Sequence, residues 1–257
     1  MLSKIKKIND KEPKIEDKKP EKKDGFFKTF LWALFCAVIL RSFLFEPFHI
    51  PSSSMYPNLL IGDYIFVNKY SYGYSRYSFP FGLDLFEGRI FKNEPQRGDI
   101  TVFRLPSRPS INYVKRLIGL PGDQIQMRDG TLFINDQEVI KTFNGDVFEF
   151  ENDKKIGFQK YSEALPNGKK INTYHRETTP QDNTGIYIVP KGHYFFMGDN
   201  RDDSQDSRFL NFVGYVPEEN LVGRASIVFF SNPNSIFEIW KWIKTIRSER
   251  IGKNLNE

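Results

Sequence analysis

The sequence predicts a mainly β protein that begins with one membrane-spanning helix. A nearly continuous apolar stretch covers Phe26–Phe45, and after it short strand-like runs alternate with turn residues. With 25 Phe, 12 Tyr, 18 Gly and 15 Pro, the composition favours short strands joined by turns over a helical bundle. A chain of 257 residues, 39% of them hydrophobic, can bury a core.

Composition also argues against several classes of protein. One Cys excludes a disulfide framework and, with three His, leaves little material for a structural zinc site. We therefore expect no metal and no cofactor. The formal charge of +5 arises largely from one N-terminal stretch, so nucleic acid is not an expected partner.

Residues 1–25 form a basic tail. They contain nine Lys, six acidic residues, two Pro and no aromatic residue, so they cannot collapse into a core and are expected to be disordered. A solvated charge run without any partner is the simplest interpretation of this tail.

The apolar stretch from 26 to 45 is the predicted transmembrane anchor. Only Lys28, Thr29, Arg41 and Ser42 are not apolar, and the two basic side chains lie near the ends, where they can reach the headgroups. Twenty helical residues span about 30 Å. No small-residue cleavage pattern follows, which favours a permanent anchor over a removed leader. The alternative is a core helix of a soluble protein.

The distribution of basic residues predicts the orientation of the anchor. Nine Lys precede it, whereas no Lys or Arg occurs between Glu46 and Asn68. The tail should be cytoplasmic and residues 46–257 should form an extracytoplasmic β domain.

Eight strand-like runs are expected in that domain. They are Tyr64–Lys69, Asp99–Phe103, Ile111–Ile118, Gln124–Met127, Thr131–Ile134, Gly185–Val189, His193–Met197 and Leu221–Phe230. Polar residues 140–184, the centre of an insertion at about 128–190, predict an inserted β-ribbon. The aromatic segment Ile236–Ile246 is helix-capable and belongs either to the core or to the membrane surface.

Three segments carry possible chemistry. The first is the serine-rich loop His49–Pro57, which by itself could be only a polar loop, because a serine nucleophile needs a base. His49, His175 and His193 have no partner motif for a Ser-His-Asp triad. Each is interpreted as an ordinary loop or sheet residue.

A lysine in the second segment can supply the base. In the run Ile111–Gly119, strand alternation places Lys115 on the face of Tyr113 and Leu117. Burial on that face would lower the pKa of the amine toward neutrality, and Ser-Lys pairs are a known form of catalytic constellation. The alternative is that the ammonium group extends to water.

The third segment is the acidic loop, Gly198–Arg208, in which none of the eleven residues has an apolar side chain. Either it is an unstructured surface loop, or ion pairs such as Asp206 with Arg208 fold it so that Ser204 faces a neighbouring amine. The spacing of an EF-hand calcium loop is absent.

These residues resemble the bacterial type I signal peptidases, also called leader peptidases. Four ordered blocks carry the resemblance, from the serine loop to the acidic loop: Pro51–Gly73, Arg97–Phe103, Tyr113–Asp123 and Gly198–Ala225. About seventy residues are covered. The resemblance implies an all-β signal-peptidase-like catalytic domain and a serine endopeptidase that removes signal peptides from exported preproteins.

The resemblance also implies roles for individual residues. Ser54 would be the nucleophile, Lys115 the general base, Ser52 an oxyanion donor together with the Ser54 N–H, and Ser204 the residue that orients the amine. Asp206 and Arg208 would brace the loop. Residues of the substrate pockets would be Phe48, Ile50, Met55, Leu59, Tyr113 and Val114, although alternation places Val114 opposite Lys115.

Two further implications concern place and sequence. The family resides in the bacterial inner membrane, with the lipid bilayer and signal peptides as partners and the active site on the outer side. This chain departs from the family at Ser53, where Gly is common, and matches no block within 140–184. Two rival classes are a membrane-anchored binding protein and a soluble self-cleaving regulator.

Overall fold

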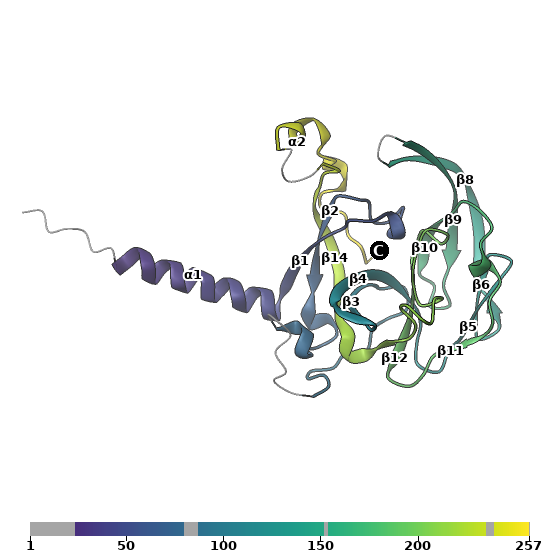
Figure 1. Ribbon diagram of the computed structural model, residues 1–257, viewed down its shortest axis with the longest axis horizontal. Helices are drawn as coiled ribbons and strands as arrows, with labels where there is room; N and C mark the ends of the chain where they lie inside the picture. The colour runs from purple at the N-terminus through teal and green to yellow at the C-terminus, as the bar shows by residue number, and fades with distance from the viewer. Residues whose placement is uncertain (1–23, 80–86, 152–153, 235–238, 257) are drawn as a thin grey trace, which may run out of the picture. The chain divides into compact units, whose positions relative to one another are not determined.

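A computed structural model describes residues 24–79, 87–151, 154–234 and 239–256 (Figure 1). The chain separates into two compact units, Met1–Ala37 and Val38–Glu257. The predicted disordered tail lies outside the described residues, apart from its last two positions.

The apolar stretch forms helix α1, Asp24–Phe43. Its segment Gly25–Phe43 has a mean hydropathy of 1.6, so it is long and apolar enough to cross a membrane. The helix ends two residues before the predicted limit at Phe45. Pro47 cannot continue a helix, and it lies instead in strand β1, Phe45–His49, an edge strand where its missing N–H is tolerated.

A seven-stranded antiparallel sheet forms the centre of the second unit, in the order β1-β2-β14-β3-β4-β12-β13. The sequence prediction of a mainly β fold is confirmed. After β1, the strands are β2 (Asp63–Asn68), β3 (Ile100–Leu105), β4 (Arg108–Gly119), β12 (His193–Met197), β13 (Val216–Pro217) and β14 (Leu221–Ser231).

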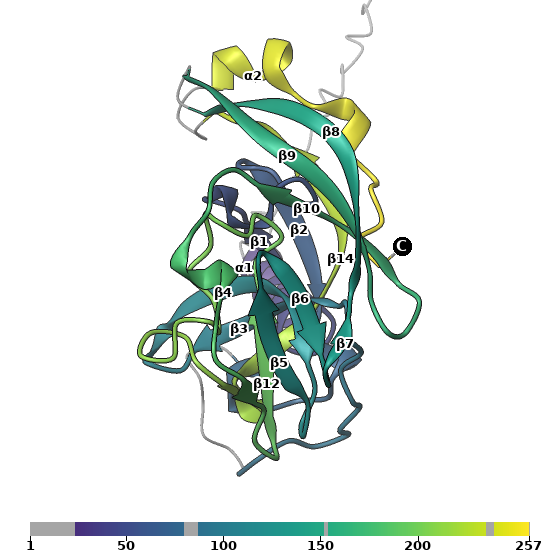
Figure 2. The ribbon, with the colours of Figure 1, turned by 90° about the vertical axis from the view of Figure 1, so that its right-hand side faces the viewer.

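The inserted region is built from two smaller antiparallel sheets. The first follows the order β10-β9-β8 and the second β11-β5-β6-β7. Figures 1 and 2 show β8 and β6 on the side of this unit away from β1 and β2. The strands are β5 (Gln124–Arg128), β6 (Thr131–Ile134), β7 (Gln137–Glu138), β8 (Ile140–Glu151), β9 (Lys154–Ala164), β10 (Lys170–His175) and β11 (Tyr187–Ile188).

Alternation along β4 divides its side chains between separate parts of the core. Leu117 packs in a cluster with Phe103 and Phe196, whereas Val114 packs against a cluster formed mainly by β2, β3 and β14. The rings of Phe103 and Phe196 stack with centroids 4.7 Å apart. The strand that carries Lys115 is therefore held by apolar packing on both faces.

The C-terminal segment contains helix α2, Ile239–Thr245, while residues 236–238 of the predicted helix lie outside the described residues. Trp242 packs on Phe230 with ring centroids 5.2 Å apart. Trp240 and Ile243 are exposed, so the core interpretation does not apply to them. Contact between this helix and lipid stays a prediction.

The fold makes one prediction about stability. Phe196→Ala should lower the free energy of unfolding by about 3–5 kcal/mol, because it removes a fully buried ring from a stacked pair. Chemical denaturation of the full chain in detergent measures this. As a control, Ile188→Ala removes an exposed side chain and should change the value by less than about 0.5 kcal/mol. Equal effects of the two substitutions would contradict the assignment of the core.

Candidate active site

Ser54 lies in a short 3₁₀ turn, Ser53–Met55, directly after the loop that follows β1. The turn is fixed to the acidic loop by three hydrogen bonds. The Asn200 backbone N–H donates to the Ser54 carbonyl at 3.1 Å, the Asn200 side chain donates to the Ser53 carbonyl at 3.2 Å, and the Ser53 hydroxyl donates to Asp203 at 2.8 Å. The Ser53 hydroxyl thus adds a side-chain hydrogen bond to the two that Asn200 makes.

Lys115 brings its amine to the Ser54 hydroxyl. Its Nζ lies 2.5 Å from Ser54 Oγ, and both side chains are buried. The Tyr113 ring lies beneath the amine, with its centroid 5.3 Å from Nζ. The sequence left open whether the ammonium group of Lys115 extends into water. In the structure Lys115 is only 4% exposed, so it does not.

Burial lowers the pKa of Lys115 from 10.5 to about 8. The negative charges of Asp206 and Asp199 act in the opposite direction, and the Arg208 charge adds to the lowering of this pKa. Desolvation of the ammonium form is the largest contribution. A substantial fraction of the amine is therefore neutral in mildly alkaline solution.

The acidic loop is folded and buried. The Arg208 guanidinium binds the Asp206 carboxylate at 2.8 and 2.9 Å, and the same carboxylate accepts the Gly198 backbone N–H at 2.9 Å. Arg208 also donates to the carbonyl of Arg201 at 2.6 Å. These bonds close the loop on itself, which keeps its charges paired.

Ser204 lies in the same cleft as Ser54 and Lys115. A Cβ added to Gly198 would stand 2.2 Å from Ser204 Oγ and 2.6 Å from the Ser54 carbonyl, so only glycine permits the two serine segments to approach each other. Among the described residues, Ser204 Oγ has no hydrogen-bond partner. Its orienting bond to the Lys115 amine stays a prediction.

Two buried ion pairs beside the site were not identified from the sequence. Arg116, next to Lys115 on β4, binds Asp199 through two bonds of 2.7 Å. Arg201 binds Glu163 of β9 at 2.6 Å and so connects the inserted ribbon to the acidic loop. The sequence did show that Arg116 lies inside a predicted strand and Glu163 inside the predicted ribbon. It did not show with which residue of opposite charge each of them pairs.

Within the described part of the chain, none of the three histidines forms a hydrogen bond to Ser54. His49 lines the cleft beside the Tyr64 ring, and burial lowers its pKa. His193 contacts the Lys191 carbonyl, and His175 lies beside Asp202. The geometry thus gives the amine, and no imidazole, direct contact with the hydroxyl.

A cleft of about 770 Å³ surrounds these groups. Five of the six predicted pocket residues line it, Val114 included, whereas Leu59 is fully buried in the core cluster with Ile50 and Met55. The residues of the predicted pocket that line the cleft are Phe48, Ile50, Met55, Tyr113 and Val114. Ser52 also lines it, and its Oγ lies 3.4 Å from Ser54 Oγ.

Two strand edges border this cleft. β1 is the outermost strand of its sheet, and β12 pairs with β4 only from Arg116 onward. Over Ile111–Lys115, the described part of the chain therefore provides β4 with one strand neighbour, β3. An extended peptide can pair with such an edge.

The fold thus places a serine beside a buried lysine in a cleft between strand edges, and Ser-Lys pairs are one of the arrangements that serine hydrolases use. The sequence matches the family described as "Signal peptidase, peptidase S26" over residues 24–230. This chain belongs to that signal peptidase family and is an enzyme of it. Membership decides against the two rival classes, a binding protein and a self-cleaving regulator.

Individual relatives agree with this assignment. Signal peptidase I of Rickettsia typhi and that of Rickettsia prowazekii are each 42% identical over 249 residues, which cover 89% of this chain and 92% of the relative. Signal peptidase I of Rickettsia conorii is 41% identical over 88% of this chain and 91% of its own. A solved signal peptidase I from Enterococcus faecalis is 28% identical and covers 51% of this chain and 97% of its own, with a TM-score of 0.30.

The burial of Lys115 makes a prediction about stability. The pKa of Lys115 is lower in the folded protein than in the unfolded chain, so protonation of this amine lowers the free energy of unfolding. The loss of stability is complete below about pH 8 and becomes smaller between about pH 8 and 10.5. Lys115→Met should therefore stabilise the fold by about 3 kcal/mol at pH 7, with a smaller gain at alkaline pH.

Denaturant titrations in detergent at several pH values test this. Lys154→Met provides the matched control, since it removes an exposed lysine of β9 and should leave the free energy of unfolding within about 0.5 kcal/mol. A gain from Lys115→Met that is absent at pH 7, or that grows with pH, would show that the amine is not destabilised by burial.

Proposed function

We propose that this protein is a membrane-bound serine endopeptidase that removes N-terminal signal peptides from exported preproteins, with Ser54 as nucleophile and Lys115 as general base. The observation that carries the proposal is the contact between a buried amine and a buried hydroxyl, 2.5 Å apart, on the wall of a cleft. The names of the relatives support the substrate class.

The chemistry begins with the neutral form of Lys115. Its Nζ takes the Ser54 proton while Oγ attacks the scissile carbonyl carbon, and the carbonyl π electrons move to oxygen. The oxyanion would be held by the Ser54 backbone N–H and the Ser52 hydroxyl. The ammonium then gives its proton to the leaving amine as the peptide C–N bond breaks, which leaves an acyl-enzyme.

Water completes the cycle. Lys115 Nζ, neutral again, takes a proton from water as the oxygen attacks the acyl carbon, and the proton returns to Ser54 Oγ when the ester breaks. Ser204 would hold the amine in line for both steps, and Asp206 and Arg208 would keep the loop that carries it rigid. The Lys115 amine thus serves as base and as acid in turn.

The cleft suits an extended segment of the preprotein. The open edges of β1 and β4 offer backbone hydrogen bonds, and the apolar side chains between them offer shallow pockets for alternate side chains of the bound strand. Ile50 precedes the nucleophile turn and Met55 belongs to it; both side chains are buried and line the cleft, and they would narrow the pocket beside Ser54.

Helix α1 would anchor the enzyme in the bacterial inner membrane, with the lysine-rich tail in the cytoplasm and the β unit on the outer side. Nine residues separate Phe45 from Ser54, so the chain holds the nucleophile within roughly 30 Å of the end of the predicted anchor. A signal peptide crosses the same membrane, and its cleavage region emerges at the same surface.

The first functional prediction concerns the general base. The value of kcat/KM should rise with pH and reach half its maximum near pH 8, because the pKa of Lys115 is lowered to about 8 and only the neutral amine can act. Lys115→Arg stays protonated at every working pH and should lower kcat/KM by at least about 10⁴-fold while the protein remains folded.

Steady-state cleavage of a preprotein in detergent, with circular dichroism as the check on folding, measures both effects. His193→Gln removes a histidine outside the cleft and should retain activity and the same pH profile. Retained activity in Lys115→Arg, or loss of activity together with the acid limb in His49→Gln, would assign the base to another residue.

The second functional prediction concerns specificity. Peptides with Ala on the acyl side of the cut should be cleaved at least about 100-fold more efficiently than the same peptides with Phe, because buried side chains restrict the space beside Ser54. Mass spectrometry of the products gives the cut position. The matched control places Phe on the leaving side, where the penalty should be smaller. Efficient cleavage after Phe would contradict the proposed pocket.

A further inference from the structure

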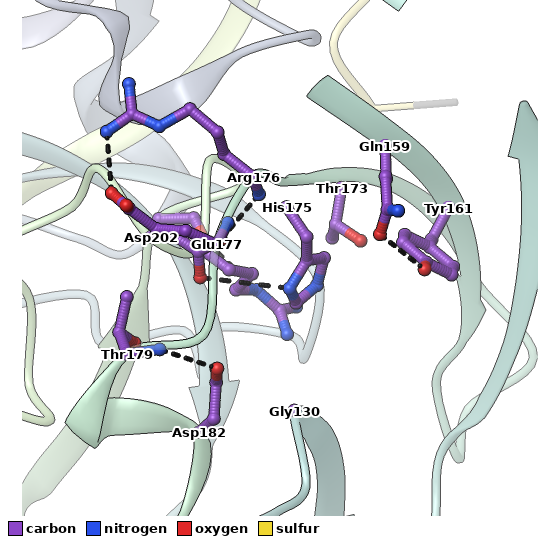
Figure 3. Close-up of polar contacts among 12 residues, drawn as sticks. Gly130, Gln159, Tyr161, Thr173, His175, Arg176, Glu177, Thr179, Asp182 and Asp202 are labelled. Carbon is purple, nitrogen blue, oxygen red and sulfur yellow. Dashed lines mark hydrogen bonds and ion pairs between the residues drawn. The ribbon is translucent and has the colours of Figure 1, made fainter. Parts of the chain in front are cut away.

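Three side chains that can bind a metal ion, His175, Asp182 and Asp202, lie close together. All three are far from Ser54 and Lys115 in the sequence. His175 ends β10, Asp182 belongs to the 3₁₀ turn Pro180–Asp182, and Asp202 belongs to the acidic loop. One ligand atom from each residue lies within 4.8 Å of the other two. Figure 3 shows a carboxylate oxygen of Asp202 facing the His175 imidazole and the Asp182 carboxylate beside Thr179.

Each carboxylate uses one oxygen for structure and leaves the other without a partner. Asp202 Oδ2 accepts the backbone N–H groups of Arg176 and Glu177 at 2.6 and 3.1 Å, and Asp182 Oδ2 accepts that of Thr179 at 2.9 Å. Both side chains are thereby oriented by the main chain (Figure 3).

The remaining atoms are buried and unsatisfied. Asp182 Oδ1, Asp202 Oδ1 and His175 Nε2 have no hydrogen-bond partner among the described residues, and His175 and Asp182 are each only 7% exposed. A buried polar atom without a partner costs about 1–3 kcal/mol, and more when it is charged. Two of these atoms are carboxylate oxygens beside one imidazole, and a bound cation would satisfy both.

We propose that His175, Asp182 and Asp202 bind a divalent cation of the zinc class. One imidazole nitrogen and two carboxylate oxygens form a three-residue set that Zn²⁺ accepts, with water as the fourth ligand. Ligand atoms at about 2.1 Å from a tetrahedral ion lie about 3.4 Å from each other. In the structure His175 Nδ1 lies 3.9 Å from Asp202 Oδ1, and the ligand atoms of the three residues all lie within 4.8 Å of one another, so they have to approach one another to reach that spacing.

The surrounding charges agree with a dication. The two carboxylates carry two negative charges, while Arg201 and Arg208 are already paired with Glu163 and Asp206. Lys141 lies nearby; its Nζ donates to the Gly130 carbonyl at 2.9 Å, and its charge interacts with those of Asp182 and Asp202. A dication would neutralise the two carboxylates directly.

The bound ion would be structural. Asp202 lines the cleft and stands two residues before Ser204, so the ion would fasten the acidic loop to β10 and to the 180–182 turn. Neither Ser54 nor Lys115 belongs to the proposed ligand set, so the proposal does not depend on the proposed peptidase chemistry.

Metal binding by the untagged full chain in detergent tests the proposal. The protein is stripped with a chelator, dialysed against ZnCl₂ or CoCl₂ and assayed for bound metal, and calorimetry measures the affinity for Zn²⁺. We expect one Zn²⁺ per chain, and a visible Co²⁺ spectrum of a low-symmetry site. His175→Gln and Asp182→Asn should each weaken Zn²⁺ binding by at least about tenfold.

Two matched controls remove similar groups outside the set. His193→Gln and Glu177→Gln should bind Zn²⁺ as tightly as the unaltered chain. If the two ligand variants fail to fold, X-ray absorption of the unaltered zinc-loaded protein still decides, with one imidazole and otherwise oxygen ligands expected. Sulfur, two or more imidazoles, no stoichiometric binding, or full affinity in a folded Asp182→Asn would each overturn the proposal.

Discussion

The dry environment of the Lys115 amine is the constraint on which the rest of the site depends. An exposed lysine is an ammonium ion at neutral pH and cannot accept a proton from a hydroxyl, whereas burial against Tyr113 and Ser54 lowers the pKa of this amine to about 8. Such burial is stable only if the protein around it excludes water and leaves no unpaired charge beside the amine. The architecture of the neighbouring strands and loop follows from that requirement.

Paired charges meet this requirement. Asp206 with Arg208, Asp199 with Arg116, and Glu163 with Arg201 are all nearly inaccessible to solvent and are joined by short bonds. Buried pairs of this kind contribute little net stability, because desolvation offsets their attraction. Their value here is positional: they fix the backbone around Gly198, which must pass within contact distance of both Ser204 and Ser54.

The inserted ribbon takes part in this arrangement, and it lies within the range that the family model matches. Tyr174 of β10 pairs with Asn200 through two backbone bonds that involve Asp199 and Arg201, and the Arg201 side chain reaches Glu163 of β9. The ribbon thus forms the rear support of the acidic loop. The proposed cation between His175, Asp182 and Asp202 would add a third connection between the same elements.

The sequence alone determined the fold class, the apolar helix and most strand positions, because these depend on local periodicity. Its resemblance to a family named Ser54 and Lys115 as the candidate pair, which stays a prediction. The sequence did not determine which charges pair across distant segments: Arg116 with Asp199 and Arg201 with Glu163 are joined only after the chain has folded. Counting Cys and His also could not reveal a mixed His and Asp cluster, whose members come from three separate elements. The sequence also did not show that Leu59 is fully buried and Trp240 exposed. Burial depends on what packs against a side chain, and only the tertiary structure decides that.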